Sequence, residues 1–394
     1  MMKKASQILF FIILAVVFVS VPVATVVGRS SVSFYEQRTL AHLPALTRAS
    51  LADGSFFADA ETFLSDHFGG RDRLIKADIR LRLMLDKPVV NGLVVNSRSL
   101  VTDHGFVRWD NGYLDASAAA RAEQYRELQE VVEANGGYFC FLTVPYHSTY
   151  FASDYPAYMD DRLWHTDRLR GCFQTAMEAV GVPYLDMYTA YKAQGLPREF
   201  YYETDHHYSL RGGFAAYEAL TAKLRAETDW AFSDNTAADD FDFVTLPNPF
   251  LGSANRKLYG LWETSDRAEI ARPKADIPFT RTDNGVPSEA RVYDVPENET
   301  ALVTYSLYMG GDIGETVIRT DRPDRPNILI YGDSFSNALE SLLWTQANEL
   351  CSLDLRHYSA MTLREYIAEY KPDIVICVRD ETVLYSETGN GRTD

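Results

Sequence analysis

The chain has 394 residues, of which 46% are hydrophobic and 13% aromatic, enough to bury a sizeable core in one large domain or two smaller ones. Its 38 Lys and Arg residues stand against 55 Asp and Glu residues, which gives a net charge of −17. Such a surface disfavours nucleic acid as a partner and gives no attraction to anionic lipid. The four cysteines show no Cys-x-x-Cys spacing, which favours buried free thiols over disulfides and supports neither zinc nor a cysteine nucleophile.

The first predicted element is an apolar segment, Ile8–Val27, which two lysines precede. A bilayer is crossed by a helix of about 20 apolar residues, and the lysines place the N-terminus inside. No small-x-small cleavage site follows promptly, so we expect an uncleaved signal anchor rather than a removed signal peptide. Residues 1–30 would then form a cytoplasmic tip and a transmembrane helix, and the remainder would be extracellular at the cell membrane.

Two helical patterns follow the apolar segment. Apolar residues share one helix face within Phe56–Leu64 and another within Leu74–Leu85, and Pro88 ends the second run. Val89–Val101 has the alternation and turn residues of a short hairpin. We expect residues 31–105 to form an N-terminal subdomain that either packs on the rest of the chain or projects from the anchor.

From about residue 106 onward, strand and helix patterns alternate. The strand patterns are Tyr138–Val144, Tyr184–Met187, Asn327–Tyr331, Ser352–Arg356 and Ile374–Val378. The helical patterns are Asp115–Ala134, Leu163–Val180, Phe335–Glu349 and Thr362–Tyr370, and one that begins at Ser209 with Phe214, Tyr217, Leu220 and Leu224 on one face. This order predicts an α/β fold for residues 106–394, a mostly parallel sheet sandwiched by helices, with ligands at the carboxyl ends of the strands.

The loop before the Ser209 helix contains Asp205, His206 and His207. Histidine is a suitable base for a serine nucleophile near neutral pH, and a carboxylate can fix its tautomer. Asp205 and His207 lie two apart, where both side chains can point to one side. Capping and loop hydrogen bonds also explain this loop. A metal site from the same three residues is disfavoured, because no carboxylate or cysteine cluster elsewhere has ligand-like spacing.

A stretch at about 228–324 interrupts the alternation and is predicted to be a β-rich insertion, since aromatic residues are spread through it. Within it, Gly252 and Asn255 offer a backbone N–H and a side-chain amide, the donor types of an oxyanion hole. Met309–Asp312 is a second stretch that could reach a site. For both stretches, tight turns are the favoured explanation.

The most informative stretch is Gly332-Asp333-Ser334, which follows a buried-strand pattern and precedes a helical one. A serine there lies at the carboxyl edge of a sheet, where backbone N–H groups and a helix dipole can stabilise an oxyanion. The tripeptide also suits an ordinary turn with Asp333 or Ser334 as a cap. If the Asp205–His207 loop and the Gly332–Ser334 turn serve only to cap helices, they can lie at opposite edges of the sheet. If they act together, His207 must meet Ser334.

Four motifs resemble the DHHW proteins of Gram-positive bacteria, a family similar to the SGNH hydrolase-like domains of alginate O-acetyltransferases: Tyr35–Pro44, Asp205–Tyr208, Tyr331–Leu339 and Asp354–Tyr358. As in the alginate-acetylation relatives, Asp-x-His precedes the serine. The resemblance implies Ser334 as nucleophile, His207 as base and Asp205 as the residue that orients the base. Tyr208 stands where the family has tryptophan, and Pro145–His147 stands where those relatives often have a lysine.

We therefore expect a membrane-anchored, extracellular acyl-transfer enzyme that needs no cofactor or metal and acts on a cell-envelope polysaccharide. Transfer to a sugar hydroxyl would make it an O-acetyltransferase, and transfer to water an esterase. Further contacts to the oxyanion or substrate are assigned to Asn337, Tyr208 and His147. The bilayer, through the N-terminal helix, and a membrane acyl-donor protein would be further partners. The alternative is a non-catalytic surface protein that binds glycan or a partner through the same cleft.

Overall fold

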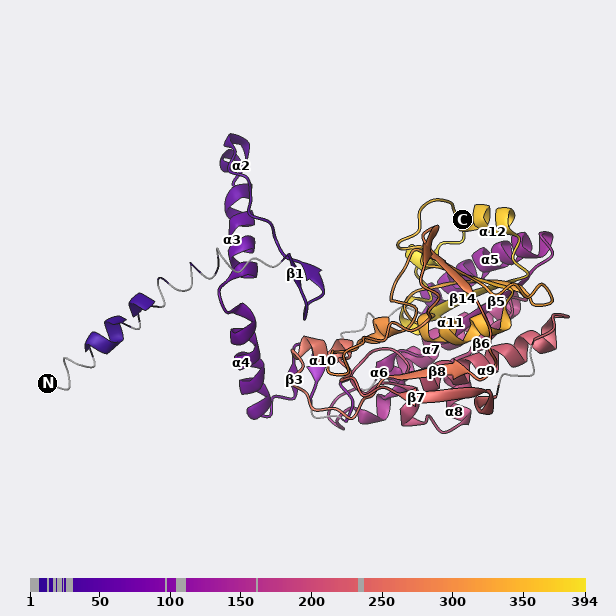
Figure 1. Ribbon diagram of the computed structural model, residues 1–394, viewed down its shortest axis with the longest axis horizontal. Coiled ribbons are helices and arrows are strands. Elements are labelled where there is room, and N and C mark those ends of the chain that lie inside the picture. Colours follow the sequence, from indigo (N-terminus) through magenta and orange to yellow (C-terminus); the bar gives the residue numbers. More distant parts are fainter. Residues whose placement is uncertain are drawn as a thin grey trace. The chain divides into compact units, whose positions relative to one another are not determined.

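The computed structural model describes residues 31–95, 98–103, 111–160, 162–232 and 237–394, together with residues 7–12, 14–16, 19, 23 and 25. The chain divides into two compact units. The smaller comprises residues 1–91 and 255–263, and the larger comprises residues 92–254 and 264–394. Figure 1 labels the elements of both units.

Among the described residues, the larger unit contains a sheet of eight strands in the order β10-β9-β11-β13-β12-β14-β5-β6. The strands from β13 to β6 are parallel to one another, whereas β11, β9 and β10 extend the sheet in antiparallel fashion. Their bounds are β5 Tyr138–Val144, β6 Tyr184–Asp186, β9 Thr280–Asp283, β10 Val286–Ser288, β11 Glu315–Arg319, β12 Asn327–Gly332, β13 Glu349–Leu353 and β14 Ile374–Asp380. The predicted mostly parallel α/β sheet is confirmed.

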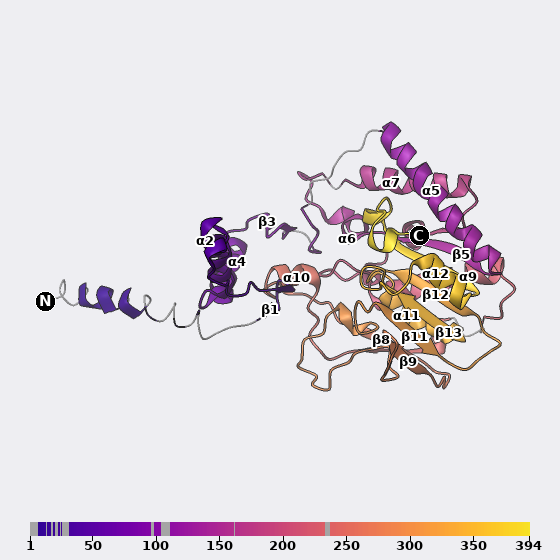
Figure 2. The same ribbon diagram turned by 90° about the horizontal axis from the view of Figure 1, so that it is seen from above.

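Helices cover both faces of this sheet because its central strands are apolar on both sides. On one face α5 (Asn111–Ala134), α7 (Leu163–Ala179) and α12 (Leu363–Tyr370) enclose the main core with alternate residues of β5, β12 and β14. Helices α5 and α7 lie side by side there (Figure 2). Outside that core, α9 (Leu210–Glu227) and α11 (Asn337–Leu343) pack on each other.

Two predicted boundaries near the carboxyl end of the chain are wrong. Strand β13 begins at Glu349 rather than Ser352, because its residues pair in register with both β12 and β11. The preceding helix α11 ends at Leu343 and gives way to a 3₁₀ turn, instead of continuing to Glu349. In both places the sheet pairing of distant segments overrides the local helical pattern.

The region at 228–324 is rich in strands where it is described, and residues 233–236 lie outside the described part. Strands β7 (Phe241–Thr245) and β8 (Glu269–Pro273) form an antiparallel pair. Strands β9, β10 and β11 join the central sheet. Residues 255–263, by contrast, belong to the smaller unit.

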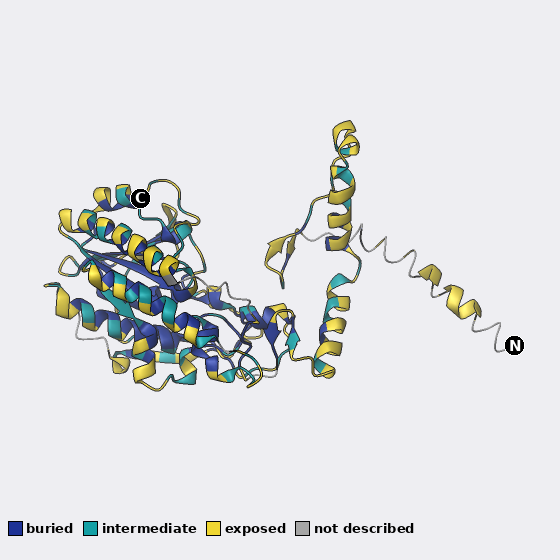
Figure 3. Cartoon of the chain, turned by 180° about the vertical axis from the view of Figure 1, so that it is seen from behind, coloured by how far each residue is buried: buried dark blue, intermediate teal, exposed yellow. Residues whose placement is uncertain are grey.

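The smaller unit is mainly helical in its described residues. It contains α2 (Arg48–Ala52), α3 (Ser55–His67) and α4 (Arg71–Met84), with β1 (Val32–Ser33), β2 (Arg38–Thr39) and β3 (Val89–Val90). The next strand in the chain is β4 (Leu93–Val94). The hairpin predicted over Val89–Val101 also includes residues 96 and 97, which lie outside the described part of the chain. The helices predicted around Phe56–Leu64 and Leu74–Leu85 are confirmed, but Figure 3 shows them exposed along much of their length.

The predicted anchor Ile8–Val27 falls partly outside the described residues, because positions 13, 17, 18, 20–22, 24, 26 and 27 are not described. Among the residues that are, we find no helix with both the length and the apolar character needed to cross a bilayer.

Candidate active site

Ser334 lies just past the end of β12, at the carboxyl edge of the parallel strands. Gly332 ends that strand opposite Val378 of β14, and a Cβ at this glycine would meet the Val378 carbonyl oxygen at 2.8 Å. The chain then turns sharply: the Ser336 N–H donates to the Asp333 carbonyl (2.8 Å) before α11 begins. Strand pairing and this turn together place Ser334 at the sheet edge.

The loop from Thr204 to Tyr208 is fixed at both ends. Ser209, where the helical pattern was predicted to begin, caps α9, since its hydroxyl accepts from the backbone N–H groups of Arg211 and Gly212. At the other end, the buried Asp266 carboxylate accepts the Thr204 N–H at 2.8 Å and the Thr204 hydroxyl at 2.5 Å. Asp266 escaped sequence reasoning because nothing in its local pattern distinguishes it from a solvated acid.

His207 connects this loop to Ser334, although the two residues are 127 positions apart. Its Nε2 lies 2.7 Å from Ser334 Oγ, and its Nδ1 lies 2.6 Å from Asp205 Oδ1. Because an ionised carboxylate can only accept, Nδ1 carries the donated hydrogen, and Nε2 of the neutral ring accepts from the hydroxyl. The structure thus joins Asp205, His207 and Ser334 in one hydrogen-bonded chain.

Asp205 is buried but ionised. Burial alone would raise its carboxyl pKa, but the charge and hydrogen bond of His207, the nearby His206 and the Ser253 N–H together hold the pKa well below its usual range. The Ser253 N–H reaches Asp205 Oδ2 at 2.6 Å. At the same sheet edge, burial and then the charge of Asp333 raise the pKa of Asp380. The edge therefore holds one carboxyl group whose pKa is lowered, Asp205, and one whose pKa is raised, Asp380.

The two adjacent histidines differ in environment. The His207 side chain is 5% exposed, and the Tyr305 ring stacks on it with centroids 3.8 Å apart and planes 7° from parallel. The His206 side chain is 34% exposed, and its Nδ1 lies 2.6 Å from Ser253 Oγ. Tyr305 therefore restricts the ring that faces Ser334. Tyr305 was not singled out from the sequence, because no local pattern connects it with His207.

The two residues proposed as oxyanion donors from the insertion, Gly252 and Asn255, lie in different units of the structure. A Cβ at Gly252 would lie 2.1 Å from the Thr204 carbonyl oxygen, so this glycine lets its loop pass close behind Asp205. The neighbouring Ser253 thereby reaches the Asp205 carboxylate. Asn255 belongs to the smaller unit, where its amide donates to the Trp262 carbonyl (2.9 Å) and accepts from the Trp262 N–H (3.1 Å).

The remaining predicted contacts are buried. Tyr208 is fully buried, and its hydroxyl donates to the Phe335 carbonyl, so it braces the turn that carries Ser334. His147 donates from Nε2 to the Tyr202 carbonyl (3.0 Å), and burial lowers its pKa to about 4. Both side chains thus support the site from within. Asn337 is the first residue of α11 and is also buried.

A family model described as the SGNH hydrolase-like domain of the acetyltransferase AlgX matches residues 101–303, more than half of the chain. The chain belongs to this family. The matched span contains Asp205 and His207 and ends before Ser334. The resemblance expected from the motifs is confirmed. No curated protein matches the chain.

Solved structures show the same fold. PatB1 of Bacillus cereus superposes with a TM-score of 0.63 at 19% identity, over 74% of this chain and 96% of its own. The same protein with a sulfonyl adduct gives 0.62 at 18% identity, over 75% and 95%. A DHHW family protein from Eubacterium siraeum gives 0.55 at 18% identity, over 77% and 95%.

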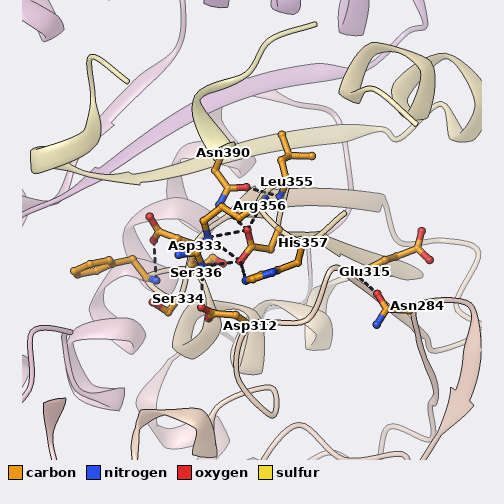
Figure 4. A network of polar contacts seen from close by, with 12 residues as sticks. Asn284, Asp312, Glu315, Asp333, Ser334, Ser336, Leu355, Arg356, His357 and Asn390 are labelled. Carbon is orange, nitrogen blue, oxygen red and sulfur yellow. Dashed lines mark hydrogen bonds and ion pairs between the residues drawn. The ribbon is translucent and has the colours of Figure 1, made fainter. Parts of the chain in front are cut away.

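The fourth motif of the resemblance, Asp354–Tyr358, follows β13 at the same sheet edge as Ser334 in this SGNH-like domain. The Arg356 guanidinium pairs with Asp354 at 2.6 Å and with Asp312 at 2.8 Å, beside Asp333 and Ser334 (Figure 4). Asn390 completes the network by donating to Asp354 at 2.9 Å. The motif therefore braces the loops next to Ser334.

Among the described residues, two groups of side chains bring possible metal ligands together: Asp205 with His206 and His207, and Asp312 with Asp354 and His357. In the first group both ring nitrogens of His207 already face Asp205 and Ser334. In the second, Arg356 supplies the positive charge that the two carboxylates require. Neither donor set favours a cation over its protein partners.

Proposed function

We propose that the chain is a serine acyl-transfer enzyme, an O-acetyltransferase or O-acetyl esterase that acts on a cell-envelope polysaccharide. The hydrogen-bonded chain from Asp205 through His207 to Ser334 carries this proposal. A serine hydroxyl is a weak nucleophile unless a base accepts its proton, and His207 Nε2 lies at 2.7 Å, within reach for that transfer.

In the first half of the reaction, Ser334 Oγ attacks the acyl carbonyl carbon while His207 Nε2 takes the hydroxyl proton. Asp205 stabilises the imidazolium through Nδ1, and the Ser334 backbone N–H is the proposed donor to the oxyanion. When the tetrahedral intermediate collapses, the bond to the leaving group breaks. The leaving group receives the proton from His207, and an acyl-serine remains.

In the second half, His207 removes a proton from the acceptor, whose oxygen attacks the acyl-serine carbonyl. Collapse of the second intermediate releases the acylated acceptor, and Ser334 Oγ regains its proton from the imidazolium. A sugar hydroxyl as acceptor gives O-acetyl transfer, and water gives ester hydrolysis. The acetyltransferase family to which the chain belongs supports the first outcome.

The site of action is proposed to be the outer face of the cell membrane. The apolar segment Ile8–Val27 and the two lysines before it support a single-pass anchor with the N-terminus inside. An anchored enzyme would meet a membrane acyl-donor protein on one side and envelope polysaccharide on the other.

Covalent labelling of the full-length protein tests the nucleophile directly. Because the similar PatB1 has been solved with a sulfonyl adduct, a sulfonyl fluoride is a suitable probe, with a fluorophosphonate as a second reagent. We expect one adduct, located on Ser334 by peptide mass spectrometry, and none in Ser334→Ala. His207→Ala should slow labelling strongly. Ser336→Ala is the matched control, because Ser336 lies in the same turn but donates to the Asp333 carbonyl.

An unlabelled Ser334 in folded protein would overturn the enzyme proposal and favour the non-catalytic binding protein. An adduct on Ser336 would overturn the assignment of the nucleophile. If Ser334 is labelled, incubating the acetylated enzyme with water alone and with oligosaccharide distinguishes the esterase from the transferase.

A further inference from the structure

Helix α4 and the residue after it expose a continuous apolar stripe. Leu81 and Leu85 follow Leu74 by 7 and 11 residues, and these spacings place all three on one side of an α-helix. Their exposed fractions are 58%, 54% and 59%. Ala77 lies along the same stripe and is also exposed. Among the residues of α4, only Ile79 is buried. The described residues of the smaller unit therefore leave uncovered the face that periodicity would assign to a core.

The same helix is basic in an acidic chain. Residues 71–84 contain five basic side chains, Arg71, Arg73, Lys76, Arg80 and Arg82, against Asp72 and Asp78, whereas the whole chain has a net charge of −17. At 100° per residue, Arg73 and Arg80 flank the leucine stripe on one side, and Asp78 and Arg82 flank it on the other. Arg82 pairs with Asp78. Within the described part of the chain, neither Arg73 nor Arg80 lies within ion-pair distance of an acidic group.

We propose that α4 binds the surface of an anionic lipid bilayer, with its axis in the plane of the interface. Leu74, Leu81 and Leu85 would enter the boundary between headgroups and acyl chains, and the flanking arginines would reach back to lipid phosphates. The inference does not depend on the chemistry at Ser334.

Charge and geometry favour lipid over the other possible occupants. A second copy of the same face would bring Arg73 and Arg80 against one another, a like-charge contact that opposes pairing. A protein partner would need an acidic rim beside an apolar centre, whereas a bilayer supplies acyl chains for the stripe and anionic groups for the margin that carries Arg73 and Arg80. The apolar segment Ile8–Val27, earlier in the chain, would hold α4 close to such a surface if it is embedded.

The test is a site-specific fluorescence measurement on the full-length protein in vesicles of phosphatidylcholine and phosphatidylglycerol. An environment-sensitive fluorophore is attached at Leu81→Cys or Leu74→Cys, and for comparison at Asp72→Cys, which lies on the opposite side of α4. All variants carry Cys172→Ser, because Cys172 is the native thiol that is not fully buried. Any anchor is common to all variants, so a difference between positions reports on α4 itself.

We expect the label at positions 81 and 74 to shift to shorter wavelength and to be quenched by lipids brominated on their acyl chains, and the label at position 72 to do neither. Replacing both Arg73 and Arg80 by Gln should lower the quenched fraction several-fold in vesicles that contain phosphatidylglycerol, because each basic group near such a surface adds on the order of five-fold to binding.

Equal behaviour of the labels at positions 81 and 72 in vesicles would overturn the proposal. So would a concentration-dependent blue shift of the position 81 label without lipid, because it would identify a second copy as the occupant. Circular dichroism of each labelled variant checks that α4 is intact, since the substitutions are at exposed positions and should leave the helix unchanged.

Discussion

Helices α9 and α4 carry the same kind of apolar periodicity, but the structure uses them differently. In α9 the predicted face, Phe214, Tyr217, Leu220 and Leu224, is buried in the larger unit. In α4 the equivalent stripe is exposed, and Ile79 is the buried residue of the helix. A helical pattern therefore shows that a helix has an apolar face, but not whether the rest of the chain covers that face.

The largest expected effect concerns the two histidines in the loop before the buried helix α9. His207→Ala should lower acyl-transfer activity by about 10²–10⁴-fold, because the serine loses its base. His206→Ala, one position away but partly exposed, should lower activity by less than about tenfold. The hydrolysis of p-nitrophenyl acetate measures both.

Within the same assay, the double variant His207→Ala, Ser334→Ala should be no worse than the more impaired single variant, since the two residues act as one unit. A strictly multiplicative loss, or an essential His206 beside a dispensable His207, would contradict the assignment.

Replacing one leucine by alanine in each helix compares α9 and α4 directly through the free energy of unfolding. Leu220→Ala in α9 removes a fully buried side chain and should lower the free energy of unfolding by about 2–5 kcal/mol. Leu81→Ala in α4 should change it by no more than about 0.5 kcal/mol in the absence of lipid. Urea unfolding, followed by circular dichroism, measures both. A large loss from Leu81→Ala without lipid would mean that the stripe is covered within the protein.

Glycines allow a smaller test of how tightly the site is packed. Gly252→Ala places a Cβ 2.1 Å from the Thr204 carbonyl and should destabilise the protein by about 1–3 kcal/mol, with a loss of activity as Asp205 shifts. Gly171→Ala lies within α7 and meets no heavy atom within 4 Å, so it should stabilise the protein by up to about 1 kcal/mol. Full activity and stability in Gly252→Ala would show that the loop behind Asp205 is not constrained.

The smallest effect concerns the buried His147. Its folded pKa of about 4 lies below the unfolded value of 6.5, so the unfolded chain binds more protons between these values. The contribution of His147 to the free energy of unfolding is therefore present above pH 6.5 and is lost as the pH falls towards 4. Between pH 7 and pH 5 the wild type should lose about 1–2 kcal/mol more than His147→Gln, which keeps a donor for the Tyr202 carbonyl.

Urea unfolding at pH 5, 7 and 8 measures that difference. From pH 7 to pH 8 the two proteins should change in parallel, because His147 is neutral in both states there. Parallel behaviour between pH 7 and pH 5 as well would show that His147 is not held in its neutral form.

Local pattern was sufficient for much of the fold and for the central residues of the site. Uninterrupted apolar runs identify β5, β12 and β14, because strands buried on both faces need apolar residues on both sides. Ser209 before α9 and Thr362 before α12 are caps whose hydrogen bonds lie within one turn of the chain. Asp205, His207 and Ser334 were singled out because their residue types suit a base, its partner carboxylate and a nucleophile, and because their order resembles that of the alginate-acetylation relatives, although capping also explained both motifs.

Only the tertiary structure decided what surrounds those residues. The stacking of Tyr305 on His207 and the bond from Ser253 to Asp205 join segments that are distant in the chain, and no local period encodes such contacts. For the same reason Gly252 packs behind Asp205 and Tyr208 is buried beneath the serine turn, roles that their neighbours in the sequence do not reveal. Periodicity gave α4 an apolar face, but whether distant parts of the chain cover that face depends on how they pack, which is a property of the whole fold.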